Sequence, residues 1–312
     1  MNHKFWQIGT YLPECIISNE DIHAQCPDFS CDYARDKLGI EFRHISKGEL
    51  CVDMAYKAVM NLKDMAEADV GQSDMLIFVT QTPDYPLPSM SCVLQDRMSL
   101  PQRTICFDIN MGCSGYIYAL STAYSYINSG LAKQAIVVTS ERYSKYISDD
   151  DYANRGIFGD AATATLVTSE MAHCMRKFAF WTDGSGYNDI IVPDIDTGFV
   201  MNGPEVMAFS IKRIPQVVKD LLSSTDIDKE DIDYFVFHQG NQYMLKNIQH
   251  RLGINEKQMV YSLKNTGNTV SSSIPIAINS LIDSDSTISG TKMLLCGFGV
   301  GLSVGAVLID CF

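Results

Sequence analysis

The chain has 312 residues, of which 46% are hydrophobic and 20% charged, a composition typical of a globular protein with a substantial core. Its 24 basic and 37 acidic residues give a net charge of −13, which argues against nucleic acid as the main partner because phosphate binding needs a basic surface. The sequence contains no apolar run of the roughly 18 to 20 residues that a membrane span requires and begins without a secretory signal pattern, so we expect a cytoplasmic protein.

Apolar runs typical of buried strands alternate with helical patterns along the chain. The predicted strands cover 75–80, 104–109, 134–141, 233–239 and 292–300. The predicted helices cover 51–66, 114–130, 243–253 and 274–283. Continuous apolar strands separated by helices indicate an α/β protein with a largely parallel sheet that is covered on both faces.

Two similar stretches suggest an internal duplication. "FGDAATATLV" (158–167) and "FGVGLSVGAVLI" (298–309) both pair Phe-Gly with small and β-branched residues. Upstream of each lies a strand that ends in a reactive residue, Cys113 in one half and His238 in the other. We therefore expect two similar, intimately packed α/β halves, 1–170 and 171–312. A pseudo-twofold axis would bring the two strand ends together, where α/β folds bind ligands.

Ten cysteines are scattered through the chain without a C-x-x-C pair or a Cys/His ligand spacing, so no metal site is expected. They are Cys15, Cys26, Cys31, Cys51, Cys92, Cys106, Cys113, Cys174, Cys296 and Cys311. Most lie in apolar runs, where a reduced cysteine behaves as a small hydrophobe. Each is therefore predicted to be structural unless its context indicates otherwise.

Cys113 has such a context, because in "ICFDINMGCSGYIYAL" (105–120) it stands between a strand and the start of a helix. Unpaired N–H groups and the dipole of a helix N-terminus favour the nucleophilic thiolate. Gly112 and Gly115 leave room for a substrate carbonyl. The alternative is a buried cysteine beside a tight strand–helix turn.

His238 ends the apolar run "YFVF" and precedes the polar "QGN". A histidine in this position can serve as a neutral hydrogen-bond donor or as a base, or it can simply cap the following helix. The other histidines have less informative surroundings and are His3, His23, His44, His173 and His250.

Two polar or glycine-rich turns complete the set of candidates. Asn268 lies in "NTGNTVSSSIP" (265–275) just before a predicted helix, where its side chain could donate to an oxyanion, although such a stretch is more often only a turn. "CGFGVG" (296–301) lacks the Lys-Ser/Thr ending of a phosphate loop. It fits a tight turn whose amides approach a substrate.

The order of these motifs resembles the β-ketoacyl-acyl carrier protein synthase III family of the thiolase superfamily. "DINMGCSGYIYAL", "FGDAA", "FHQGN", "GNTVSSSIP" and "GFGVG" follow one another as in that family. The resemblance extends from "IGTYLPE" (8–14) through "LGIEFRHI" (38–45) to the C-terminus. It implies a thiolase-like fold of two similar halves, layered αβαβα, and a role in fatty acid biosynthesis.

The resemblance also implies a mechanism, because the family's catalytic Cys, His and Asn match Cys113, His238 and Asn268. Cys113 would attack an acyl-CoA, and the backbone N–H groups of Cys113 and Val300 would hold the oxyanion. Malonyl-acyl carrier protein would then enter, and His238 and Asn268 would donate to its thioester carbonyl while carbon dioxide leaves. No cofactor is expected, with coenzyme A entering only as the thioester substrate.

The resemblance also implies which residues bind coenzyme A, and some of them differ from those usual in the family. Tyr33 and Lys37 match a tryptophan and an arginine that sandwich the adenine in the family, and lysine is a poorer planar partner than arginine. Arg155 in "NRGIFGD" and Asn241 in the "HQ-x-N" motif are retained, whereas Tyr243 replaces a basic residue.

The acyl pocket and the carrier surface are also implied. Gln81 and Leu87 stand in the pocket loop "TQTPDYPLPS" (80–89) where a threonine and a phenylalanine often occur, which suggests a starter larger than acetyl. The "MNGPEV" stretch (201–206) looks like members outside housekeeping fatty-acid synthesis. The predicted docking patch for the acidic carrier comprises Lys212, Arg213, Lys246 and Arg251.

Two other functions remain open at this point. A thiolase-fold acyltransferase could move the acyl group from Cys113 to an alcohol or amine with His238 as general base, and a non-catalytic subunit could only bind the acyl carrier protein. The intact Cys/His/Asn set counts against the second, because pure binding does not need it. The resemblance further implies a homodimer, in which a loop of one subunit lies near the partner's acyl pocket.

Overall fold

The computed structural model describes residues 5–284 and 291–310, so His3 and Cys311 lie outside the described residues. Its first large sheet has the order β1 (Ile8–Tyr11), β7 (Ala161–Thr168), β6 (Gln134–Glu141), β4 (Met75–Val79) and β5 (Ile105–Ile109). Its second has the order β11 (Tyr234–Phe237), β12 (Met293–Gly299), β13 (Ser303–Ile309) and β8 (Met175–Thr182). The first sheet therefore draws all its strands from before residue 169 and the second from after residue 174, on either side of the predicted boundary between the halves.

Both sheets are mixed, which corrects the expectation of a largely parallel sheet. β4 runs parallel to β5 and β6, but β7 runs antiparallel to β6 and to β1. In the second sheet only β11 and β12 are parallel. The strands nevertheless read as continuous apolar runs, because helices cover the sheets on both faces.

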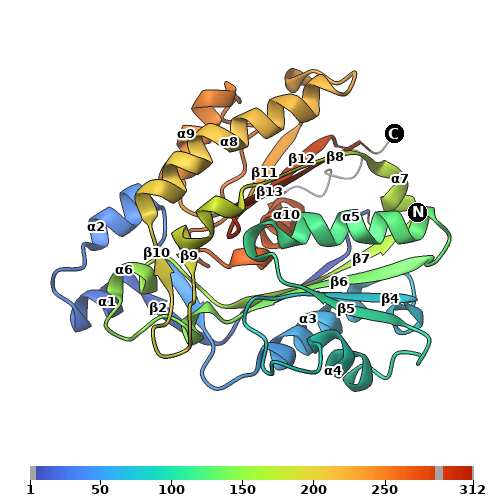
Figure 1. The fold of residues 1–312 in the computed structure, drawn as a ribbon, viewed down its shortest axis with the longest axis horizontal. Helices are drawn as coiled ribbons and strands as arrows, with labels where there is room; N and C mark the ends of the chain where they lie inside the picture. Colours follow the sequence, from blue (N-terminus) through green and yellow to red (C-terminus); the bar gives the residue numbers. More distant parts are fainter. Residues whose placement is uncertain (1–4, 285–290, 311–312) are drawn as a thin grey trace.

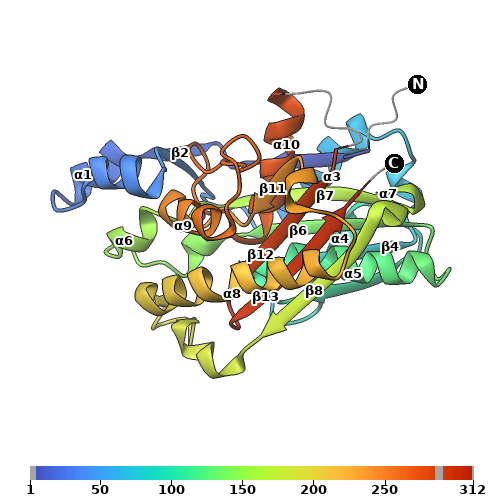
Figure 2. The same ribbon diagram turned by 90° about the horizontal axis from the view of Figure 1, so that it is seen from above.

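Figures 1 and 2 show five layers, as the resemblance implied. α3 (Cys51–Met65) and α4 (Met90–Arg97) cover the outer face of the first sheet. α5 (Gly115–Asn128) and α10 (Ser273–Ser284) lie between the sheets and contact strands of both. α8 (Gly203–Ser223) covers the second sheet and packs against α9 (Gln242–Leu252). No helix among residues 5–284 and 291–310 is long and apolar enough to cross a membrane.

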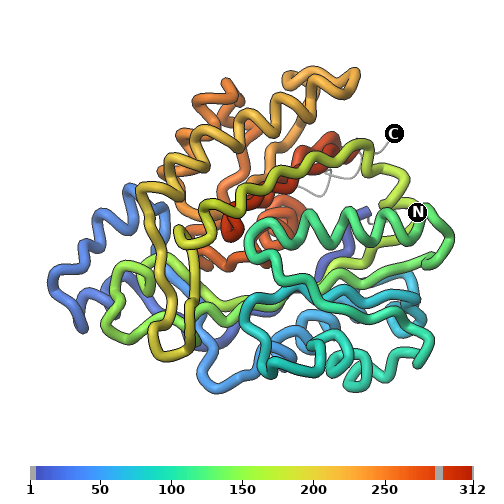
Figure 3. The backbone as a smooth tube through the Cα atoms, viewed as in Figure 1, coloured from blue at the N-terminus to red at the C-terminus, as the bar shows by residue number. Residues whose placement is uncertain are grey.

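Shorter elements gather at one end of the molecule. β2 (Cys15–Ser18) pairs with β3 (Phe42–Ile45), and β9 (Ile190–Ile191) pairs with β10 (Val200–Met201). The short helices α1 (Asn19–Gln25), α2 (Cys31–Tyr33) and α6 (Tyr152–Arg155) lie at this end, whereas α7 (Ser169–Cys174) lies at the opposite end (Figure 1). The tube in Figure 3 shows the β9–β10 hairpin at the end of the molecule that carries α1, α2 and α6.

The topology supports the predicted duplication, but the strands that correspond between the two halves are not the ones expected from the sequence. The pairings β4–β6, β6–β7 and β7–β1 recur, in the same directions, as β11–β12, β12–β13 and β13–β8. β11 thus corresponds to β4, and the counterpart of β5 is reduced to an isolated parallel bridge between Met259 and Phe235 of β11. Cys113 follows β5 whereas His238 follows β11, so the two residues do not occupy equivalent strand ends. The equivalent segments are the turns that precede the two central helices, α5 and α10.

Candidate active site

Cys113, His238 and Asn268 line one cavity of about 90 Å³, which we call the nucleophile cavity. Each comes from a different segment: Cys113 lies in the 3₁₀ turn η3 (Gly112–Ser114), His238 follows β11, and Asn268 precedes the 3₁₀ turn η7 (Val270–Ser272). The aliphatic, methionine and phenylalanine side chains of the lining are Ile157, Phe158, Ile190, Phe199, Met201, Val206, Met207, Met244, Phe298 and Val300. Among the described residues, no lysine or arginine lines this cavity.

Cys113 is buried, with 7% of its surface exposed, directly before α5. Burial raises the pKa of its thiol and the nearby Glu141 carboxylate raises it further, while its own backbone N–H acts in the opposite direction. The predicted helix N-terminus is therefore present, but desolvation outweighs its effect on the thiol in the free protein. The thiol is therefore protonated at neutral pH.

His238 is held as a neutral imidazole. Burial lowers its pKa to about 3, against a smaller opposing contribution from the Val270 carbonyl. Its Nδ1 lies 2.7 Å from Ser273 Oγ, and its backbone N–H donates to Cys296 O at 2.8 Å. When Ser273 donates to Nδ1, the ring proton is on Nε2, which can then donate to a substrate oxygen.

Asn268 is fixed at both its backbone and its side chain. Its N–H donates to Ile157 O at 2.9 Å, and its carbonyl accepts from Gly159 N at 3.0 Å. The N–H of Val270 donates to Asn268 Oδ1 at 2.9 Å. Because the oxygen of the amide is engaged, the NH₂ group is the part left to donate to a ligand.

The "CGFGVG" stretch packs against the nucleophile. A Cβ on Gly299 would lie 3.0 Å from Cys113 Cβ and 3.1 Å from its Sγ, so glycine allows the chain to approach the thiol. A Cβ on Gly297 would lie 2.6 Å from Cys113 O. Val300 follows and lines the cavity. Its N–H as an oxyanion donor stays a prediction.

Of the four residues predicted to bind coenzyme A, Asn241 lines the nucleophile cavity, whereas Tyr33, Lys37 and Arg155 do not. Asn241 lines the cavity and also caps α9, accepting from Met244 N at 2.8 Å. Tyr33 is 58% exposed and Lys37 is exposed. Arg155 donates to Asp149 O at 2.6 Å and lies over a tyrosine ring of its own helix.

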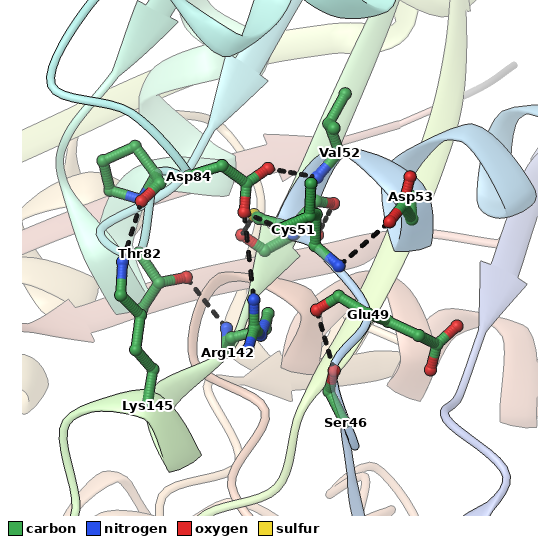
Figure 4. A network of polar contacts seen from close by, with 12 residues as sticks. Ser46, Glu49, Cys51, Val52, Asp53, Thr82, Asp84, Arg142 and Lys145 are labelled. Atoms are coloured by element: carbon green, nitrogen blue, oxygen red, sulfur yellow. Dashed lines mark hydrogen bonds and ion pairs between the residues drawn. The ribbon is translucent and has the colours of Figure 1, made fainter.

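The 80–89 loop has an anchored base and an exposed tip (Figure 4). Asp84 accepts from Cys51 N at 2.7 Å and Val52 N at 2.9 Å at the start of α3. The backbone N–H of Arg142 donates to Thr82 Oγ1 at 2.8 Å, and Lys145 Nζ donates to Pro83 O at 3.1 Å. This base is rigid.

The two loop residues predicted to line the acyl pocket lie in different surroundings. Gln81 lies against Gly112, beside Cys113. Leu87, at the tip, is 80% exposed and does not line the nucleophile cavity of its own chain. A role for Leu87 in an acyl pocket therefore requires a second copy of the chain.

The predicted carrier patch spans α8 and α9, which pack together. Lys212, Lys246 and Arg251 are exposed. The guanidinium of Arg213 instead lies 5.0 Å from the centroid of the Trp181 ring. Arg251 is ten residues along α9 from Asn241, about 15 Å at 1.5 Å per residue, so Lys246 is the nearer of the two to the cavity.

Sequence reasoning missed Glu141, which acts electrostatically on the Cys113 thiol, and Tyr143, which lines its cavity. Glu141 is fully buried and accepts from Gln81 N at 3.0 Å and Ser271 Oγ at 2.7 Å. Burial raises its pKa to about 7. A carboxyl that closes the apolar strand 134–141 was the available signal, since buried acids are rare unless they are bonded. Tyr143 lines the nucleophile cavity, and nothing in its local sequence indicated this.

Known proteins with similar sequences share one description. A family model described as 3-oxoacyl-[acyl-carrier-protein] synthase III matches residues 107–184, and one described as its C-terminal part matches 222–311. The chain is 34% identical to beta-ketoacyl-[acyl-carrier-protein] synthase III of Clostridium novyi over 99% of both chains. It is 33% identical to the enzyme of the same name from Neisseria meningitidis over 97% of both chains.

Solved structures give the same result. A crystal structure of a 3-oxoacyl-(acyl-carrier-protein) synthase III has a TM-score of 0.92 and 33% identity, covering 97% of this chain and 98% of the other. The Pseudomonas aeruginosa protein of the same description has a TM-score of 0.92 at 26% identity, covering 97% and 96%. The priming beta-ketosynthase of a polyketide biosynthetic pathway has a TM-score of 0.89 at 25% identity, covering 97% and 94%.

Proposed function

Because the chain belongs to the 3-oxoacyl-[acyl-carrier-protein] synthase III family, we propose that it is an acyltransferase that condenses an acyl group with malonyl-acyl carrier protein. In the first stage Cys113 Sγ attacks the carbonyl carbon of an acyl-CoA. The new sulfur–carbon bond replaces the bond to coenzyme A, which leaves as a thiol with the proton that Cys113 gives up. The N–H groups of Cys113 and Val300 would bear the oxyanion of this step.

In the second stage the malonyl thioester carbonyl would sit between two neutral donors. Loss of carbon dioxide leaves the electron pair on the α-carbon and charge on the thioester oxygen, where the protons of His238 Nε2 and the Asn268 amide stabilise it. The enolate carbon then attacks the acyl-Cys113 carbonyl, and the bond to Cys113 Sγ breaks as the β-ketoacyl thioester forms. The released Cys113 thiolate takes a proton from solvent, which restores the thiol. The reaction as written balances without a metal or redox cofactor.

The observation that carries this proposal is the neutrality of His238 beside an oriented Asn268 amide in the cavity of Cys113. A pKa near 3 suits a hydrogen-bond donor and makes a weak base, which counts against acyl transfer to an alcohol or amine with His238 as the base. A subunit that only binds carrier protein would have no need of the three residues in one cavity.

The test is to incubate the protein with a panel of acyl-CoAs and malonyl-acyl carrier protein. We expect an acyl adduct by intact-mass spectrometry that disappears in Cys113→Ala, and carbon dioxide release that disappears in His238→Ala. An adduct without malonyl consumption would favour the simple acyltransferase, and the absence of any adduct would favour the binding subunit.

For the carrier protein we propose docking on Lys212, Lys246 and Arg251, with Arg213 as a weaker contributor because it already covers Trp181. Charge reversal at Lys212 and Lys246 should raise KM for the malonyl-carrier substrate and leave KM for acyl-CoA unchanged. Equal increases for both substrates would contradict this surface.

We also propose a homodimer built on the free edge of the first sheet. β5 is the last strand of that sheet among the described residues, and its five residues are all only partly buried. A second copy would cover this edge, which a monomer would leave open to unwanted pairing, and could receive the exposed Leu87. Sedimentation or light scattering should give about twice the 34.7 kDa of one chain.

Cytoplasmic localisation is likewise a proposal. The nine cysteines within the described residues are all free thiols, which is typical of a reducing compartment.

A further inference from the structure

A second cavity, of about 230 Å³, adjoins the nucleophile cavity. Tyr143, Ile190, Phe199 and Val300 line both cavities, so the two meet at these residues. Gln81 belongs to the second cavity and its amide lies against the backbone of Gly112, the residue before Cys113. An acyl chain that leaves Cys113 toward the second cavity therefore passes the Gln81 amide within its first few carbons.

The lining of the second cavity is polar around Gln81. Tyr143 donates its hydroxyl to Gln81 Oε1 at 2.7 Å, and Tyr146 donates to the Gln81 carbonyl at 3.3 Å. The Gln81 N–H donates to Glu141. The engaged Oε1 fixes the amide so that its NH₂ group is left to donate, and Asn110, which is exposed, adds a second amide at the open side.

The remaining lining limits the ligand to a neutral chain. Ile190, Ile191 and Val192 offer an apolar surface to methylene groups. Among the described residues, no lysine, arginine or histidine lines this cavity. An acyl chain with a terminal carboxylate would therefore lose its hydration without gaining a counter-charge from the lining.

We propose that the acyl group loaded onto Cys113 is a short neutral chain with an oxygen substituent, a hydroxyl or a keto group, near its third carbon. Gln81 donates to that oxygen, Tyr143 holds the Gln81 amide in place, and Asn110 borders the mouth. An unsubstituted chain of the same length would cover the Gln81 NH₂ group without giving it an acceptor, which is unfavourable for a desolvated donor. This inference rests on the proposed thioester exchange at Cys113 and adds no further chemical step.

The experiment compares butanoyl-CoA with each enantiomer of 3-hydroxybutanoyl-CoA, which have the same chain length. The rate of adduct formation at Cys113 is followed by quenched-flow intact-mass spectrometry, and condensation by carbon dioxide release from malonyl-acyl carrier protein. We expect one hydroxy enantiomer to load at least about tenfold faster than butanoyl. Equal or faster loading of butanoyl overturns the inference while leaving the proposed function intact. Failure of all three to load also overturns the inference, and failure of every acyl-CoA in the wider panel overturns the proposed function.

Two variants test whether Gln81 and Tyr143 are the source of the preference. Gln81→Leu should bring the ratio of the two loading rates close to one, whereas the matched surface change Gln102→Leu should keep the wild-type ratio. Tyr143→Phe, which changes only one oxygen, should reduce the ratio by releasing the Gln81 amide, and it keeps the test available if Gln81→Leu does not fold. A wild-type ratio in both folded variants would overturn the assignment.

Discussion

The turns that precede the two central helices are counterparts in the duplicated fold, yet they have different tasks. η3 and η7 contact each other, and each contains a positive φ, 50° at Gly112 and 53° at Val270. The next residue is Cys113 in one turn and Ser271 in the other. The thiol of Cys113 faces the cavity, whereas the hydroxyl of Ser271 donates to Glu141. One turn thus presents a nucleophile, and the other is tied down so that Asn268 and His238 are held in place.

The positive φ is accommodated differently in the two turns. At Gly112 a Cβ would collide with the side-chain oxygen of Gln81, so a larger residue would have to displace a side chain that Tyr143 holds by a hydrogen bond. Val270 is a β-branched residue with an unfavourable φ, and it is completely buried in the core. Strain of this kind costs about 1 to 2 kcal/mol and persists where surrounding structure enforces it. The Val270 carbonyl acts on His238, so the strained turn contributes to the site.

The largest expected effect is on the rate of condensation, which depends on Asn268 beside η7, whereas acyl loading depends on Cys113 in η3. Asn268→Ala removes one of the two donors to the enolate, so condensation should slow by about 100- to 1,000-fold. Acyl loading on Cys113 should persist, because that step uses the other turn. Single-turnover carbon dioxide release and intact-mass spectrometry measure the two stages. Asn265→Ala changes an exposed neighbour in the same loop and is the matched control. If Asn268→Ala slowed acyl loading as much as condensation, the two turns would not serve separate stages.

Gly112→Ala tests the crowding at the first turn. The substitution adds the cost of a positive φ to a collision with Gln81, so we expect the free energy of unfolding to fall by about 2 kcal/mol or more. Gly130→Ala is the matched control, since Gly130 also has a positive φ, 76°, but its Cβ would meet no atom within 4 Å. Urea unfolding of both variants measures the difference. Equal losses would show that Gln81 exerts no steric constraint at Gly112.

Glu141→Gln tests the anchor of the second turn. Because burial raises the pKa of Glu141 to about 7, the folded state holds its proton more tightly than the unfolded state. Its contribution to stability is complete below about pH 4.5 and is lost as the pH rises through about 7, with a slope of at most about 1.4 kcal/mol per pH unit. Unfolding at several pH values should show this slope in the wild type and its loss in Glu141→Gln. The exposed Glu14→Gln should retain it, and an unchanged slope in Glu141→Gln would contradict the assignment.

The smallest expected effect concerns His238. With a pKa of about 3, its imidazole stays neutral from pH 5 to pH 8, so condensation from a preformed acyl-enzyme should vary less than about twofold in that range. The measurement is made in the Glu141→Gln background, so that this carboxyl does not titrate. A fall in rate with a midpoint near pH 6.5 would show that His238 ionises normally and is more exposed than the structure indicates.

Much of the fold could be predicted from local patterns. The strand expected at 134–141 is observed as Gln134–Glu141, and the helix expected at 51–66 as Cys51–Met65. The order of the motifs gave the family and pointed to Cys113, His238 and Asn268, which share one cavity. The prediction of a largely parallel sheet was wrong, because the direction of a strand depends on its connections to other strands and not on its own residues.

The sequence by itself determined most of the strands and helices and the three candidate catalytic residues, because hydrophobic periodicity and motif order are properties of the chain. Only the tertiary structure decided that Glu141 acts on the nucleophile and Tyr143 lines its cavity, that Leu87 is exposed, and that the thiol and the imidazole are both neutral at pH 7. Those properties arise from desolvation and from contacts between segments up to about two hundred residues apart, and no local pattern carries them.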